Sequence, residues 1–97
     1  MNLNAETMTT YTKPSDFGRA LKVGPYAWPG GYPLYFITSD GEALSFDAAK
    51  ENARQICAAI REKSDDGWRV LTCDVNWEDS ELTCVHTGKR IESAYAD

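Results

Sequence analysis

The segment Trp68–Trp77 constrains the fold more than any other, because its side chains alternate between two faces as they do in a β-strand. One face would carry Trp68, Val70, Thr72, Asp74 and Asn76, and the other Arg69, Leu71, Cys73, Val75 and Trp77. Apart from Arg69, the second set is the more apolar, so we expect it to point into the core for most of its length. The pattern predicts a strand in a sheet that has one buried face.

Two further segments have strand patterns. Residues 34–38 are rich in β-branched and aromatic side chains, and Ser39-Asp40-Gly41 after them is a turn in which glycine supplies a positive φ. Residues 42–46 are therefore expected to return as the second arm of a hairpin. Residues 82–85 predict another short strand, and residues 91–96 predict a short strand or a helical turn anchored by Ile91 and Tyr95.

Between the hairpin and the long strand, apolar residues recur with the period of a helix: Ala49, Ala53, Ile56 and Ile60. This stripe predicts a helix that Asp47 caps and that runs to about Lys63. A shorter helix is expected nearer the N-terminus, with Ser15 as its N-cap and with its end at Gly24 and Pro25.

Together these patterns predict one α+β domain over residues 1–97. In it a small antiparallel sheet, made of a hairpin plus two or three short strands, packs with one main helix and a short N-terminal helix. Residues 1–14 are polar and unpatterned, and we expect them to be loose. The Pro- and Gly-rich segment 24–33 predicts an ordered loop whose aromatic rings pack on the core, and an aromatic platform for a base or another ligand is the alternative.

The net charge and the cysteines of the chain restrict the class of partner and the compartment that we expect for it. Ten basic and fifteen acidic residues give a net charge of -5, which excludes a nucleic-acid-binding surface over the whole molecule, because phosphate binding depends on cations. A basic partner is favoured instead. Three widely spaced cysteines, Cys57, Cys73 and Cys84, favour reduced thiols in a cytosol. No apolar run approaches about 18 residues, so neither secretion nor membrane spanning is expected.

Catalysis, a cofactor and a metal are not expected. His86 is the only histidine, and neither a nucleophile motif nor a glycine-rich phosphate loop accompanies it. Cys84 and His86 are two possible zinc ligands, but a structural zinc usually takes two ligand pairs. A metal-binding or nucleic-acid-binding protein that uses these two side chains with Lys89 and Arg90 stays open as the alternative.

Two segments of the chain carry acidic residues and no basic ones. Residues 40–49 contain three carboxylates and residues 70–82 contain four, which together exceed the net charge of the whole chain. They are Asp40, Glu42 and Asp47 in the first segment and Asp74, Glu78, Asp79 and Glu81 in the second. A fold that brings the segments together would present carboxylates where a cationic site binds phosphates. A solvated acidic surface that only keeps the protein soluble is the alternative.

Four stretches resemble small zinc-ribbon-like proteins of phages and mobile elements: residues 26–36 (YAWPGGYPLYF), 40–44 (DGEAL), 74–79 (DVNWED) and 88–95 (GKRIESAY). In that family one CxxC pair follows the first hairpin strand and a second pair precedes GKRIESAY. Here the first pair falls on Ser45 and Ala48 and the second on Cys84 and Thr87, so three of the four ligands are missing. The resemblance therefore implies the fold without the metal.

The short length, the acidic balance and this metal-free variant of a phage-type scaffold also resemble the small anti-CRISPR proteins, specifically the type I-F inhibitors that mimic DNA. This resemblance implies a non-enzymatic inhibitor of the CRISPR surveillance complex (Csy, or Cascade). It would bind the large PAM-reading subunit and the neighbouring basic subunits and block the binding of double-stranded target DNA, with the seven carboxylates in place of phosphates.

The same resemblance implies that the protein needs no cofactor, that it contacts neither nucleic acid nor a membrane, and that it acts in the cytoplasm of a bacterial host. Binding of the complex away from its DNA site, through Trp28, Tyr32 and Trp77, is a further alternative.

Overall fold

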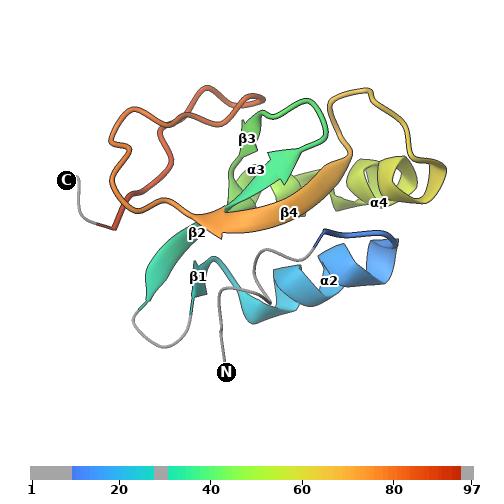
Figure 1. Cartoon of the computed structure of the whole chain (residues 1–97), viewed down its shortest axis with the longest axis horizontal. Coiled ribbons are helices and arrows are strands. Elements are labelled where there is room, and N and C mark those ends of the chain that lie inside the picture. The colour runs from blue at the N-terminus through green and yellow to red at the C-terminus, as the bar shows by residue number, and fades with distance from the viewer. Residues whose placement is uncertain (1–9, 28–30, 95–97) are drawn as a thin grey trace.

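The computed structural model describes residues 10–27 and 31–94, which form a small antiparallel sheet packed with helices. The elements are α2 (Pro14–Val23), β1 (Tyr26–Ala27), β2 (Tyr32–Thr38), β3 (Ala43–Leu44), α3 (Phe46–Glu51), α4 (Ala53–Glu62) and β4 (Val70–Val75) (Figure 1). The predicted α+β class is therefore confirmed. Within the described residues, no helix has the length and apolar composition needed to cross a membrane.

β2 is the strand to which the other three are hydrogen-bonded, and all of its pairings are antiparallel. β4 lies beside residues 34–38 of β2, whereas β1 and β3 each make a short pairing with it. The hairpin predicted after residue 38 is present, although its second arm is only Ala43–Leu44 instead of residues 42–46. The following residues leave the sheet early because they begin α3.

The register between β2 and β4 shifts near the end of β2. Ile37 pairs with Thr72 and Thr38 with Val70, which leaves Leu71 as an extra residue in β4. The predicted alternation is therefore wrong at this point: Val70 is completely buried, whereas Leu71 is only half-buried.

At the other end of β4 the prediction is partly confirmed. Cys73 and Val75 are buried as expected. Beyond the strand, however, Trp77 is 41 % exposed, and Asn76 is the buried residue. The burial of these two residues is the reverse of the prediction because the chain leaves the sheet after Val75, so strand alternation no longer applies to them.

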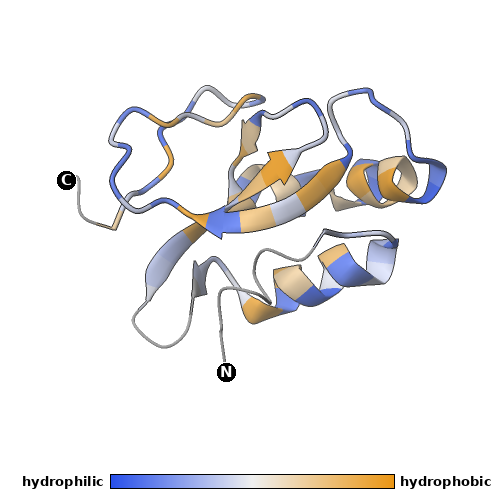
Figure 2. Cartoon of the chain, in the orientation of Figure 1, coloured by the Kyte–Doolittle hydropathy of each residue, from blue (hydrophilic) through white to orange (hydrophobic). Residues whose placement is uncertain are grey.

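The core lies between β2 and the helices, with Phe36 near its centre. The Phe36 ring centroid is 5.2 Å from that of Phe17 in α2, 4.9 Å from that of Phe46 in α3 and 6.5 Å from that of Tyr11. Figure 2 shows where hydrophobic residues occur along the strands and α4. Tyr11 is buried, so the chain is packed from this residue on, although residues up to 14 were expected to be loose. Residues 1–9 lie outside the described part.

The helix predicted over residues 47–63 is two helices, α3 and α4, which are separated at Asn52. The Asn52 side chain donates a 2.8 Å hydrogen bond to the carbonyl oxygen of Ala48, and the Asn52 backbone departs from helical geometry with φ -112° and ψ 25°. Ser45 is the N-cap instead of Asp47, because its hydroxyl accepts from the Ala48 N–H at 3.2 Å. The apolar stripe is confirmed, because Ala49, Ile56 and Ile60 are buried and Ala53 is half-buried.

α2 is capped from a residue that precedes the predicted cap. Lys13 is the N-cap residue, and the Asp16 carboxylate accepts hydrogen bonds from the N–H groups of Thr12 at 3.0 Å and Lys13 at 3.2 Å. These bonds, that of Thr12 above all, lower the pKa of Asp16. Ser15 lies inside the helix, so the prediction that it is the N-cap is wrong: the cap lies two residues earlier, and the Asp16 carboxylate bonds back to the N–H groups that precede the helix.

The chain after β4 forms a hydrogen-bonded loop instead of the predicted strand over residues 82–85. Of the predicted strand only an isolated antiparallel bridge between Thr83 and Arg90 is present, beside a 2.7 Å hydrogen bond from the N–H of Ile91 to the carbonyl oxygen of Leu82. Residues 91–94 are likewise irregular, although Ile91 is buried as an anchor should be. Tyr95, the second expected anchor, lies outside the described residues.

Candidate functional site

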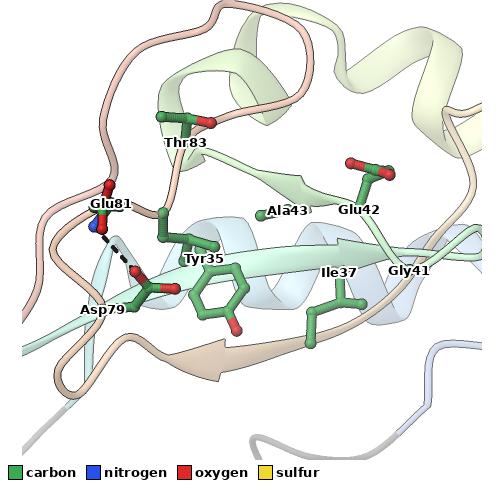
Figure 3. Close-up of a pocket in the computed structure, with 9 residues that line it drawn as sticks. Tyr35, Ile37, Gly41, Glu42, Ala43, Asp79, Glu81 and Thr83 are labelled. Atoms are coloured by element: carbon green, nitrogen blue, oxygen red, sulfur yellow. Dashed lines mark hydrogen bonds between the residues drawn. The ribbon is translucent and has the colours of Figure 1, made fainter.

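The sheet face opposite the core carries an open groove with a volume of about 390 Å³ (Figure 3). Its floor contains Tyr35 and Ile37, which alternate along β2 with the core-facing Phe36. Ala43 of β3 and Leu82 of the loop after β4 complete the apolar lining. Sequence reasoning did not identify this groove, because its sides come from segments that lie far apart in the chain.

Three carboxylates line the groove: those of Glu42, Asp79 and Glu81. Glu42 belongs to the first acidic segment, and Asp79 and Glu81 belong to the second. The fold therefore places residues of both segments around one groove. Figure 3 shows Glu42 at one end of the groove and Asp79 with Glu81 at the other, with Tyr35 and Ile37 between them. All three acidic residues are exposed, and among the residues that the structure describes no lysine or arginine lines the groove with them.

Asn76 fixes the turn that carries Asp79 and Glu81. Its buried side-chain Nδ2 donates to the carbonyl oxygen of Asp79 at 3.0 Å and lies 3.2 Å and 3.1 Å from those of Ile91 and Glu92. Its Oδ1 accepts from the Asp79 N–H at 3.2 Å, and the Asp79 carboxylate accepts from the Glu81 N–H at 2.9 Å. This amide therefore organises the acidic turn. The strand pattern had placed Asn76 on the outer face, so nothing in the sequence indicated this role.

Asp74 lies beside the groove floor. It is half-buried and pairs across the sheet with Tyr35, and its Oδ1 accepts from the Val75 N–H at 2.7 Å. Burial raises the pKa of Tyr35, and the negative charges of Asp74 and Asp79 raise it further. The field of the second acidic segment thus reaches the floor of the groove.

Asp40 and Glu78 are exposed and do not line the groove. Asp40 is in the turn between β2 and β3, where the Thr38 hydroxyl donates a hydrogen bond to its carboxylate and lowers its pKa. The Thr38 hydroxyl also accepts from the Glu42 N–H at 3.2 Å. One buried threonine therefore orients the turn that carries both Asp40 and Glu42.

Asp47 is separated from the groove carboxylates. It is exposed in the first turn of α3 and does not line the groove. The Tyr26 hydroxyl donates a 2.9 Å hydrogen bond to Glu92, and this bond, the charge of Glu92 and, to a smaller extent, burial and the charge of Asp47 raise the pKa of Tyr26. The two acidic segments therefore converge only in part.

The positions that match the two ligand pairs of the zinc-ribbon-like family also meet. Cys84 is 1 % exposed, and Ser45 and Thr87 form hydrogen bonds to its sulfur through their backbone and side-chain groups. Burial raises the pKa of the Cys84 thiol, but these hydrogen bonds outweigh it and lower the pKa to about 7. One thiol, two hydroxyls and the methyl group of Ala48 do not make a zinc-binding donor set.

His86 is directed toward Trp68, and the two rings stack with centroids 3.8 Å apart and planes 6° apart. Its Nε2 lies 3.4 Å from the carbonyl oxygen of Gly67. In the part of the chain that the structure describes, no three His, Cys, Asp or Glu side chains are grouped as a metal would require. Lys89 and Arg90 are exposed on the same loop. This geometry gives no support to a metal site built on Cys84 and His86.

Of the three aromatic residues proposed as an alternative contact surface, Tyr32 and Trp77 contact each other, with ring centroids 4.6 Å apart. Trp77 is 41 % exposed, so the pair forms an aromatic patch near the start of β2. Trp28 lies outside the described residues.

No protein family, no curated protein and no solved structure matches the chain. The geometry of the groove and its carboxylates is therefore the main ground for a functional inference.

Proposed function

We propose that the protein is a non-enzymatic inhibitor that mimics double-stranded DNA and blocks target-DNA binding by the type I-F CRISPR surveillance complex. The observation that carries the proposal is the convergence of Glu42 with Asp79 and Glu81 around one groove. The partner follows from the resemblance to anti-CRISPR proteins, and the site of action would be the cytoplasm of the bacterial host. The contacts would be lysines and arginines of the large PAM-reading subunit and of its basic neighbours.

The acidic turn has the rigidity that such a mimic needs. Asn76 holds the backbone of this turn at Asp79, and the hydrogen bond from the Glu81 N–H holds the Asp79 carboxylate before any partner arrives. Preorganised groups lose less conformational entropy on binding than mobile ones do. A carboxylate cluster without neighbouring bases also attracts a basic surface over a distance and so raises the association rate.

The test is displacement of DNA from the purified type I-F complex. A fluorescent duplex with a PAM is bound to the complex, and the protein is titrated in while fluorescence anisotropy is recorded. The wild-type protein is expected to displace the duplex. The variant Glu42→Gln, Asp79→Asn, Glu81→Gln should need a concentration at least about tenfold higher, because three charge contacts are lost.

A matched control changes the charge by the same amount elsewhere. Glu51→Gln, Glu62→Gln, Asp66→Asn alters three exposed carboxylates of α3, α4 and the turn after α4 that neither line the groove nor belong to the two acidic segments. This variant should displace DNA within about twofold of the wild type, because only long-range charge effects remain. If the wild-type protein fails to displace the duplex, or if both variants lose the same amount of activity, the proposal is wrong.

A further inference from the structure

We infer that the groove is a receptor for an arginine side chain of a basic protein partner, with the guanidinium group on the ring of Tyr35. The inference rests on the proposed function in that the partner is a basic protein surface. It goes further by naming the side chain that enters the groove and the residue that selects it.

The shape and chemistry of the groove suit a long cationic side chain. Its apolar lining of Ile37, Ala43 and Leu82 can cover the methylene groups of the side chain, which cationic residues commonly bury while their charged ends remain in a polar environment. A volume of about 390 Å³ is at the lower end of the range for ligand sites, roughly 300–1,000 Å³, and is adequate for one side chain with part of its backbone.

The charges around the floor favour a cation at Tyr35. The negative charges of Asp74 and Asp79 raise the pKa of the Tyr35 hydroxyl. Figure 3 shows Glu42 at the opposite end of the same groove from Asp79. Within residues 10–27 and 31–94, Arg69 forms an ion pair with Asp65 at 3.8 Å. This pair does not involve the carboxylates that line the groove. A partner's cation can therefore meet these carboxylates without displacing an internal salt bridge.

An arginine fits these groups better than a lysine does. The guanidinium is planar and weakly hydrated, so it can stack on the Tyr35 ring and still direct N–H groups toward Asp79 and Glu81 at the edge. A lysine ammonium offers a compact, strongly hydrated charge and cannot form a two-pronged contact with a carboxylate. The groove is expected to distinguish the two side chains through Tyr35.

The test uses two synthetic peptides, acetyl-GRGRG-amide and acetyl-GKGKG-amide, titrated into the ¹⁵N-labelled protein at low salt. Amide shifts are expected at Ile37, Ala43 and Leu82, with binding of the arginine peptide about threefold tighter, as a cation–π contact of ordinary strength implies. Tyr35→Leu should remove this preference, whereas Tyr35→Phe should keep it, because the phenylalanine retains the ring face. Tyr26→Leu, which changes an exposed tyrosine outside the groove, should have no effect on the preference.

Thermal melts of the three tyrosine variants establish that each is folded before binding is compared. Equal binding of the two peptides, shifts confined to residues outside the groove, or a preference that survives Tyr35→Leu would each overturn the inference.

The DNA-displacement assay separates this inference from the proposed function. If the peptides show no arginine preference while the wild type still displaces DNA, only the arginine receptor is wrong. If the arginine peptide binds as expected while DNA is not displaced, the receptor stands and the proposed inhibitor does not.

Discussion

The two faces of β2 are built from neighbouring residues but by different interactions. On the helix-covered face, Phe36 is completely buried against aromatic rings of α2 and α3. On the opposite face, Tyr35 and Ile37 are half-buried and form the floor of a groove with a carboxylate rim. Because successive side chains of a strand point to opposite faces, one strand can place a stabilising residue directly beside a binding residue.

The walls of the groove also differ from the core in the interactions that stabilise them. The loop after β4 provides Asp79, Glu81 and Leu82, and much of its conformation depends on polar contacts of Asn76 and Cys84. The core is therefore maintained mainly by apolar burial, whereas the groove wall depends strongly on a few hydrogen-bonded side chains. Substitutions on each side should separate the two kinds of stabilisation.

The largest effect is expected on the covered face. Phe36→Ala should lower the free energy of unfolding by about 3–5 kcal/mol, because it leaves a cavity among packed aromatic rings. Tyr35→Leu should cost less than about 1 kcal/mol, because the residue is only half-buried and keeps an apolar side chain. Urea unfolding followed by circular dichroism measures both. Equal losses from the two variants would contradict the proposed division of roles between the faces.

A smaller effect is expected from Asn76→Ala. Removal of the amide leaves the partly buried backbone groups of the acidic turn without their partner and should lower the free energy of unfolding by about 2–3 kcal/mol. In the folded variant, amide hydrogen exchange should increase at Asp79 and Glu81 more than in β2. Uniform changes across the sheet would show instead that Asn76 supports the whole fold.

The smallest effect is a pH dependence that arises from Cys84. Its pKa of about 7 in the folded protein is below the ordinary value of 9.0, so between these values the unfolded chain holds a proton that the folded protein has lost. Stability should therefore rise with pH over this range and fall as the pH drops through about 7, by about 1–2 kcal/mol between pH 6 and pH 8.5.

Cys84→Ser removes the titrating thiol and keeps a small polar side chain. The pH dependence of its unfolding free energy over the same range should be weaker by that amount. Parallel curves for the wild type and Cys84→Ser would mean that the hydrogen bonds from Ser45 and Thr87 do not stabilise the thiolate.

Local patterns predicted much of the fold because they depend on near neighbours in the chain. The apolar stripe from Ala49 to Ile60 and the turn at Gly41 were recognisable from spacing and residue type alone. The break at Asn52 was missed because a side-chain hydrogen bond to Ala48 competes with the helix. The extra residue at Leu71 was missed because a bulge depends on how two strands align, not on the composition of either strand.

Part of the candidate site was also predictable. The absence of basic residues around Glu42 and around Asp79 and Glu81 is visible in the sequence, and the fold does bring these three together. The separate position of Asp47 was not predictable, because it depends on which way α3 leaves the hairpin. The sequence did not indicate that Tyr35 lies in a groove, since an aromatic residue in a strand is more often part of the core.

The sequence by itself determined the α+β class, the approximate positions of the elements and the two base-free acidic segments. Only the tertiary structure decided which carboxylates share a groove, that Asn76 holds their turn, and that Ser45 meets Cys84. The physical reason is that secondary structure and charge density are set by residues close together in the chain. A binding surface is set by the register and packing of segments that are distant in it.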